Sequence, residues 1–212
     1  MAWDSYIKQY QSYLRIERGL SANSIENYTF DILRLCRYLD EHEISVSPVN
    51  ITQEQVQHFI YEIAKQVNAR SQSRIISGLK SFFNYIIFEG YRKDHPLELV
   101  ETPKIGRKLP DTLSLDEIDG LIGAIDLSTP EGERNRAILE TLYGCGLRVS
   151  ELINLKISDI FSDEGFLKVT GKGNKQRFVP LSPVTEKYML LYKKEIRSHI
   201  AIQKGHEDVL FL

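Results

Sequence analysis

The chain has 212 residues, a formal net charge of −2 and a pI near 6.2, and these values do not favour a DNA-binding protein, whose binding domain often has a pI above about 9. Its 42% hydrophobic and 26% charged residues are typical of an ordinary soluble globular protein. No apolar run approaches the roughly 18 residues of a membrane span, and Cys36 and Cys145 lie outside any CxxC pattern, so we expect a cytoplasmic protein with no membrane partner, no disulfide framework and no metal site.

The first ninety residues are predicted to form four amphipathic helices, because apolar residues recur there at spacings of three and four. Residues 23–26 and 52–55 each fit a capping box, which predicts that the second and third helices start there. The fourth helix is expected from about Ala69 to Glu89, with Gly90 as its stop. Four such helices with short connections predict a compact bundle.

A linker is expected after this bundle. His95-Pro96 ends any helix, and residues 102–110 have no hydrophobic period and contain two prolines with basic residues between them. We therefore predict a helical domain over residues 1–100, a linker over 101–110 and a second domain over 111–212.

The second half is predicted to mix helices with one β-hairpin. A capping box at Ser114 opens a helix with Ile118, Leu121 and Ile122 inward, and a second helix is expected from about Arg134 to Tyr143. We expect a break at Gly144 and Gly146, a short helix over 149–155, strands at 165–170 and 177–181 joined by a basic turn, and a helix from the Ser182-Pro183 cap to about Gln203.

The last five residues, 208–212, contain four consecutive apolar side chains. They predict a buried segment, either a terminal strand tucked into a sheet or the start of an element that continues. We favour the second interpretation, because native chain ends are usually polar and frayed.

Two stretches carry a resemblance to a known family. Residues 141–155, TLYGCGLRVSELINL, resemble the arginine box of the tyrosine site-specific recombinases, and residues 171–181, GKGNKQRFVPL, resemble that family's β-hairpin lysine motif. Their order and separation match, and residues 19–28 and 92–110 resemble the opening of the core-binding domain and the interdomain segment. The resemblance covers the whole chain and is strongest to the Xer type, which resolves chromosome dimers in chromosome partition at cell division.

The resemblance implies a mainly α fold: a four-helix, SAM-like core-binding domain followed by an incomplete α+β catalytic domain with a β-hairpin. It implies that Arg148 and Lys172 are catalytic and that Glu151 supports the arginine. A guanidinium can hold two phosphate oxygens, and a lysine can protonate the leaving 5′ oxygen. From the residues alone, Arg148 is better explained by a surface pair with Glu151, and Lys172 by a solvated turn.

DNA-binding roles are predicted for Lys175 and Arg177 on the hairpin and for Arg70, Arg74 and Lys80 on the fourth helix. Arg70, Arg74, Ser77 and Ser81 share one polar helix face, which suits the major groove but is equally typical of a solvated surface. The helix start at Asn23 and Ser24 could also present backbone N–H groups to a phosphate.

Two catalytic features that the resemblance implies are missing from these 212 residues. The family uses a downstream H-x-x-R and a tyrosine nucleophile, yet none of the five histidines begins H-x-x-R, and Tyr188 and Tyr192 are not at the position of a nucleophile. We expect recombination through a 3′-phosphotyrosyl link without a cofactor, with four protomers of this or a related recombinase on two double-stranded sites. The 212 residues alone should not cleave; the alternative is a non-catalytic DNA-binding protein that regulates or competes with full-length recombinases.

Overall fold

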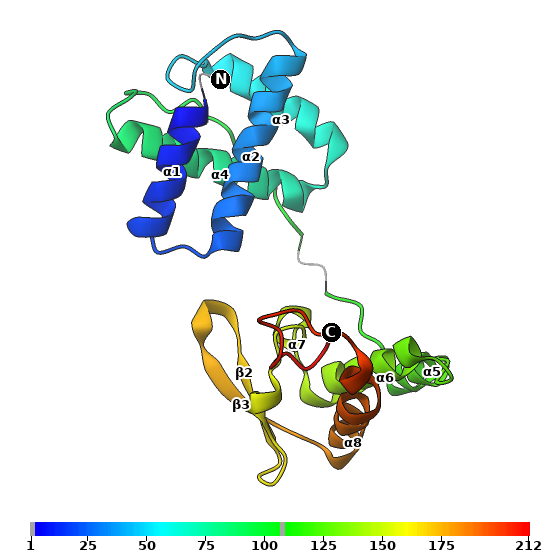
Figure 1. Ribbon diagram of the computed structural model, residues 1–212. Helices are drawn as coiled ribbons and strands as arrows, with labels where there is room; N and C mark the ends of the chain where they lie inside the picture. The colour runs from blue at the N-terminus through cyan, green and yellow to red at the C-terminus, as the bar shows by residue number, and fades with distance from the viewer. Residues whose placement is uncertain (1–2, 107–108) are drawn as a thin grey trace. The chain divides into compact units, whose positions relative to one another are not determined.

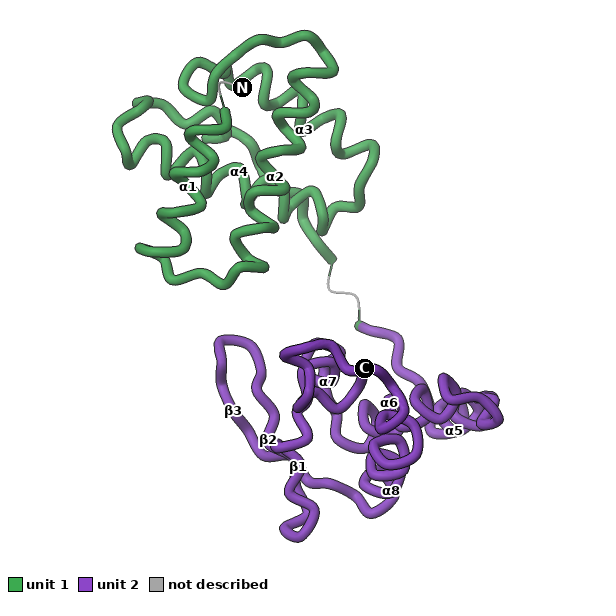
Figure 2. The backbone as a smooth tube through the Cα atoms, viewed as in Figure 1, with its two compact units in different colours: residues 1–109 green, residues 110–212 purple. Residues whose placement is uncertain are grey.

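The computed structural model describes residues 3–106 and 109–212, so Arg107 and Lys108 of the predicted linker lie outside the described residues. The chain divides into two compact units, Met1–Leu109 and Pro110–Leu212, called unit 1 and unit 2 below (Figure 2). The division falls inside the stretch predicted as a linker.

Unit 1 is a bundle of four helices, as predicted (Figure 1). They are α1 Asp4–Ile16, α2 Ala22–Glu41, α3 Gln53–Gln66 and α4 Ala69–Phe88. Each buries the apolar stripe seen in its sequence, and α2 and α4 pack on one another at the centre. The core is rich in aromatic rings, with Trp3, Tyr10, Phe82, Phe83 and Tyr85 in mutual contact.

The predicted start of α2 is wrong by two residues. Ser21 is the N-cap and accepts a hydrogen bond from the backbone N–H of Ser24, so Asn23 and Ser24 lie inside the first turn. Gly19 has a φ of +60° and lets the chain turn just before this cap. The capping box of α3 is confirmed at Thr52 and Gln55.

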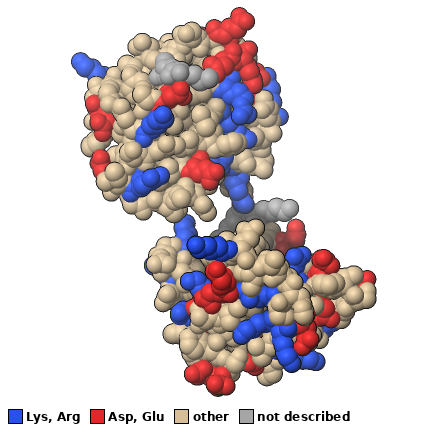
Figure 3. Space-filling model, in the orientation of Figure 1, with Lys and Arg blue, Asp and Glu red and all other residues tan. Residues whose placement is uncertain are grey.

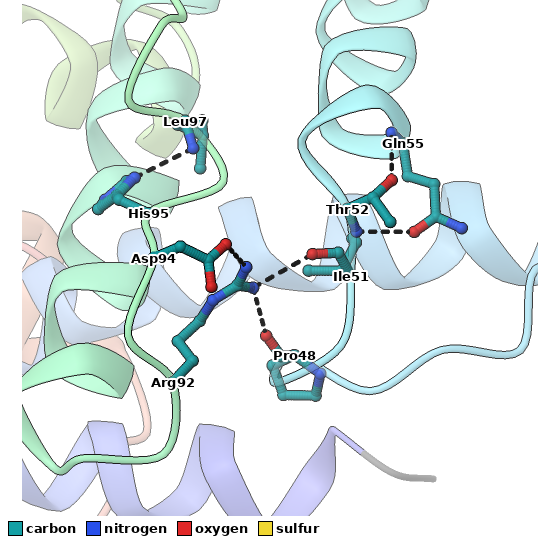
Figure 4. Close-up of polar contacts among 8 residues, drawn as sticks. All are labelled: Pro48, Ile51, Thr52, Gln55, Arg92, Asp94, His95 and Leu97. Carbon is teal, nitrogen blue, oxygen red and sulfur yellow. Dashed lines mark hydrogen bonds and ion pairs between the residues drawn. The ribbon is translucent and has the colours of Figure 1, made fainter.

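The segment after α4 is fastened to the bundle by Arg92 (Figure 4). Its buried guanidinium donates to the carbonyl oxygens of Pro48 (3.0 Å) and Ile51 (3.2 Å), pairs with Asp94, and lies over the ring of Phe83. The side chains of Leu97 and Val100 are buried as well. Residues 92–100 therefore belong to unit 1.

Unit 2 combines helices with a small antiparallel sheet of strand order β1-β2-β3. Its elements are α5 Leu115–Gly123, α6 Pro130–Cys145, α7 Val149–Leu152, β1 Ile160–Phe161, β2 Phe166–Thr170, β3 Gln176–Pro180 and α8 Pro183–Leu191, with short helical turns at Ile157–Asp159, Lys172–Asn174, Tyr192–Ile196 and Arg197–His199. The predicted hairpin is confirmed, with Lys168 opposite Phe178 and Val169 opposite Arg177. α6 and α8 pack together beside the sheet (Figure 1).

Helix boundaries in unit 2 differ from prediction at α6, at α7 and at the last helix. α6 begins at Pro130 rather than near Arg134, because Thr129 caps it and proline suits the first helical position. α7 ends at Leu152, and the last helix passes into a π turn after Leu191 and ends at His199 instead of Gln203. Leu121, predicted inward, is exposed on α5.

Within residues 208–212, Asp208 is exposed and the apolar residues that follow it pack against the core of unit 2. Leu210 and Phe211 are buried, Phe211 stacks on Tyr192, and Leu210 N–H donates to the carbonyl of Leu155. Val209 forms an isolated bridge with Lys156, so the predicted buried segment is present without becoming a regular strand. Across the described residues, no helix is long and apolar enough to cross a membrane.

Candidate functional site

A buried carboxylate, Glu151, is the centre of the candidate site. Its side chain is only 2% exposed and accepts four N–H groups. Arg148 supplies two of them, its backbone N–H and Nη1, both at 2.9 Å. Arg177 supplies the other two in a fork, with Nη1 at 2.8 Å and Nη2 at 2.9 Å. Both oxygens of the carboxylate are thus saturated.

Local sequence explains why Arg148 lies beside Glu151. Gly146 has a φ of +58° and ends α6, and Arg148 then becomes the N-cap residue of the short α7. Glu151 is three residues further on, where its side chain reaches back to the N-cap backbone as in a capping box. The Arg148 side chain remains 71% exposed, so the rest of its guanidinium faces solvent.

The hairpin reaches the same carboxylate from the other side. Arg177 lies on β3, and a Cβ placed on Gly171 would be 2.9 Å from Glu151 Oε1. A side chain at this position would force the Glu151 carboxylate or the turn to shift. Gly171 N–H also donates to the Lys175 carbonyl at 2.8 Å, which closes the turn that carries Lys172.

The charges around Glu151 favour its ionised form. Hydrogen bonds from Arg177, then from the Arg148 backbone, lower the pKa of Glu151 from 4.5 to about 2 against the opposing effect of burial. The two arginines and one carboxylate leave a net charge of +1, with exposed N–H groups on Arg148. Such a site suits an anionic ligand.

This pKa shift predicts acid sensitivity. The folded-state pKa is depressed, so the stabilisation by Glu151 is full above pH 4.5 and is lost as pH falls towards 2. We expect Glu151→Gln to flatten the dependence of unfolding free energy on pH between 4.5 and 2, as measured by urea unfolding. Arg177→Met should move the acid loss to higher pH. Identical curves for wild type and Glu151→Gln would contradict the assignment.

Lys172 and Lys175 lie in the turn between β2 and β3 and are exposed. Gly173 and Asn174 both have positive φ, at +73° and +58°, which bends the chain sharply after Lys172. The structure therefore places the predicted catalytic lysine on a tight turn whose first residue, Gly171, rests against Glu151.

The predicted DNA-binding residues of α4 have different surroundings. Arg70 is exposed, and no hydrogen bond of its side chain is found within the described residues. Arg74 pairs with the buried Asp31 of α2 at 2.7 Å, and Lys80 Nζ donates to the Val100 carbonyl at 2.8 Å. Ser81 accepts a hydrogen bond from Tyr10, so part of the predicted polar face is engaged within the bundle.

Gly144 has a packing role that the sequence analysis missed. It lies inside α6 rather than at a break, and a Cβ there would be 2.1 Å from Thr185 Oγ1 of α8. The predicted helix break at Gly144 is therefore wrong, and the helix ends at Gly146 instead.

The two tyrosines of the last helix contact neighbouring residues of unit 2. Tyr192 is buried, and its hydroxyl accepts a hydrogen bond from Leu212 N–H. Tyr188 lies beneath the guanidinium of Arg136. Among the described residues, no group of three or more histidine, cysteine, aspartate or glutamate side chains could hold a metal ion.

Comparison with known proteins identifies the family. Residues 7–90 match the model of the family "Phage integrase, N-terminal SAM-like domain", and residues 111–212 match that of the "Phage integrase family". Tyrosine recombinase XerD of Oceanobacillus iheyensis is 39% identical over 207 residues, 97% of this chain and 69% of that protein. The XerD of Staphylococcus haemolyticus is 37% identical over 210 residues, 99% of this chain and 70% of that protein. The chain belongs to the phage integrase family of tyrosine recombinases, and the predicted resemblance to the Xer type is confirmed.

Solved structures support the fold. A lambda integrase dimer bound to a COC′ core site matches with a TM-score of 0.71 at 23% identity, covering 91% of this chain and 69% of that one. XerH bound to its difH substrate in a pre-cleavage complex matches with a TM-score of 0.65 at 22% identity, covering 97% of this chain and 59% of that one. A longer lambda integrase chain is spanned over only 54% of its length. The helical domain followed by a mixed domain is thus the architecture of known recombinases.

Proposed function

We propose that this chain takes part in site-specific DNA recombination, with Arg148 and Lys172 acting on one DNA phosphate. The observation that carries the proposal is the Glu151 carboxylate, which holds an exposed guanidinium on one side and the base of the lysine-bearing turn on the other. The XerD relatives are tyrosine recombinases, a family whose activity is DNA strand exchange, and this similarity supports the same activity here.

The residues suit the chemistry of phosphodiester cleavage. When a hydroxyl attacks phosphorus, negative charge gathers on the non-bridging oxygens, and the guanidinium of Arg148 can neutralise it through paired N–H groups. The leaving 5′ oxygen needs a proton, and Lys172 on its exposed turn can donate one. Glu151 keeps the Arg148 backbone and side chain in one orientation, so that less ordering is needed when DNA binds.

Covalent catalysis through a 3′-phosphotyrosyl link would conserve the bond energy, so rejoining would need no high-energy cofactor. The tyrosine nucleophile and the H-x-x-R motif that the family uses are not found in these 212 residues. We propose that the chain in this form binds double-stranded DNA and holds the phosphate but does not cut it. Recombination would take place with four protomers on two sites.

The test of DNA binding is its dependence on salt. Basic and acidic side chains are interspersed on the face drawn in Figure 3, and the chain carries −2 overall, so binding must come from local contacts. We expect fluorescence anisotropy with a labelled 30-base-pair duplex to show affinity that falls steeply from 50 to 200 mM salt, because each neutralised phosphate contributes about −0.9 to the slope of log affinity against log salt. Affinity that does not change with salt would overturn the proposal.

A second measurement addresses cleavage. Incubation with a nicked duplex, which traps a covalent intermediate by releasing a short strand, should give no adduct on a denaturing gel. A covalent adduct would show that a nucleophile is present in these residues and would refute the proposed lack of cutting. The alternative function, a non-catalytic DNA-binding protein that competes with full-length recombinases, also predicts DNA binding without an adduct. Displacement of a full-length recombinase from the same duplex would then favour this alternative.

A further inference from the structure

We propose that Arg177 is a positioning residue: through Glu151 it fixes the turn that carries Lys172 against the helix that carries Arg148. The sequence had favoured a direct phosphate contact for Arg177. The inference rests on the proposed function, because it concerns how the two catalytic groups are held on one phosphate.

The contacts of Arg177 are directed inward. Its terminal nitrogens donate to the two different oxygens of Glu151 at 2.8 and 2.9 Å, the forked geometry in which arginine binds a carboxylate most tightly. The carboxylate is buried, whereas the Arg177 side chain is 40% exposed. The hairpin is thereby joined to α7 by a charge-assisted pair that spans 26 residues of sequence.

Gly171 makes the connection to Lys172 short. A Cβ at this position would lie 2.9 Å from Glu151 Oε1 and 3.4 Å from Arg177 Nη1, so the backbone passes directly against the ion pair. Lys172 is the next residue, and the Gly171 to Lys175 hydrogen bond limits the turn. Movement of the Arg177–Glu151 pair would therefore displace the turn at its base.

The Arg177–Glu151 ion pair carries no net charge that would attract a DNA phosphate. Both of the Arg177 terminal nitrogens face a carboxylate that also binds Arg148, and the positive charge of Arg177 is opposed at contact distance. The fork occupies one N–H on each terminal nitrogen of Arg177, and a phosphate that bound the remaining N–H groups would lie beside the Glu151 carboxylate, which repels it. Lys175, exposed on the same turn, is the better candidate for a plain phosphate contact.

The experiment is a double-mutant cycle between Arg177→Lys and Lys172→Met, read as the salt slope of binding to the labelled 30-base-pair duplex. Lysine keeps the charge but loses the fork. If Arg177 positions Lys172, then Arg177→Lys, Lys172→Met and the double variant should each lower the slope by about 0.9, because all three lose the same contact. The control Lys175→Met should lower the slope by about 0.9 alone and by about 1.8 together with Lys172→Met.

Several outcomes separate the two proposals. An unchanged slope for Arg177→Lys, or a further loss when it is added to Lys172→Met, would overturn the positioning role and leave the proposed function intact. A wild-type chain whose binding does not depend on salt would overturn both. Amide hydrogen exchange gives a reading without DNA: in Arg177→Lys, the Gly171 amide should exchange faster while the β1–β2 pairing at residues 160 and 167 keeps its protection. Equal protection of Gly171 in both chains would also contradict the role.

Discussion

Arg74→Met is expected to destabilise unit 1 by about 2–3 kcal/mol at pH 7, because it leaves the buried carboxylate of Asp31 without its half-exposed partner. Asp31 of α2 is buried, and its Oδ2 accepts a hydrogen bond from Arg74 at 2.7 Å. Its other oxygen, Oδ1, is also buried and has no hydrogen-bond partner among the described residues. Without Arg74, an ionised carboxylate would remain inside the bundle with no direct counter-charge, beside Gly78, where a Cβ would lie 2.6 Å from Oδ2.

The pH dependence of this penalty has a definite sign. Burial raises the pKa of Asp31 in spite of Arg74, so the folded state binds the proton more readily than the unfolded state. Stability is therefore lost as pH rises through the folded-state pKa, and removal of Arg74 raises that pKa further. The destabilisation by Arg74→Met should shrink as the pH is lowered from 7 towards the ordinary aspartate pKa of 3.8.

Trp3 makes the measurement specific to unit 1. It is the single tryptophan of the chain and is buried in the helical bundle, so urea unfolding followed by its fluorescence reports that unit. Asp31→Asn is the matched control, because it removes the charge and frees Arg74, which is 46% exposed and returns to water. We expect Asp31→Asn alone to cost about 1 kcal/mol and to rescue most of the loss in the Arg74→Met background. A loss of less than about 1 kcal/mol for Arg74→Met would refute the argument.

Most of the fold could be predicted because local signals agreed with the tertiary structure. The apolar stripes of α1 to α4 and the capping boxes at Thr52 and Ser114 each specify an element without help from distant residues. The errors occur where two signals compete. Ser21 and Asn23 are both good N-cap residues, and the turn at Gly19 decided for the earlier one. The first turn of α6 is polar and gave no hydrophobic period, so its Thr129-Pro130 start was missed.

The candidate site was predictable in part for the same reason. Arg148 and Glu151 are three residues apart on one helical turn, and their pairing follows from that spacing. Arg177 meets Glu151 from 26 residues away, and the spacing of two motifs does not reveal which hairpin side chains face a helix outside the hairpin. Asp31 did leave a signal: it lies one turn from Tyr28 and Leu35 on the apolar face of its helix, where a carboxylate needs a partner.

Gly132→Ala is expected to destabilise unit 2 by about 3 kcal/mol, the upper part of the range for overpacking. Gly132 lies in the first turn of α6, and its N–H donates to the N-cap oxygen of Thr129 at 3.0 Å. A Cβ there would be 1.8 Å from the carbonyl oxygen of Asp126 and 2.8 Å from its carbon. Because both are backbone atoms, no side-chain rotation can relieve the clash, and either the cap or the preceding loop must move.

Gly120→Ala is the matched control for this substitution. Gly120 lies within α5, and a Cβ there would meet nothing within 4 Å, so alanine should stabilise the helix by about 0.5–1 kcal/mol. The two variants make the same chemical change in two helices of one unit, and opposite signs are expected. Urea unfolding by far-ultraviolet circular dichroism, with hydrogen exchange at β2 and β3 as the report on unit 2, measures both. If Gly132→Ala were as stable as wild type, the loop at Asp126 could move without a free-energy cost. The contact of Gly132 with the Asp126 backbone would then not fix the N-terminus of α6, the helix that leads to Gly146 and Arg148.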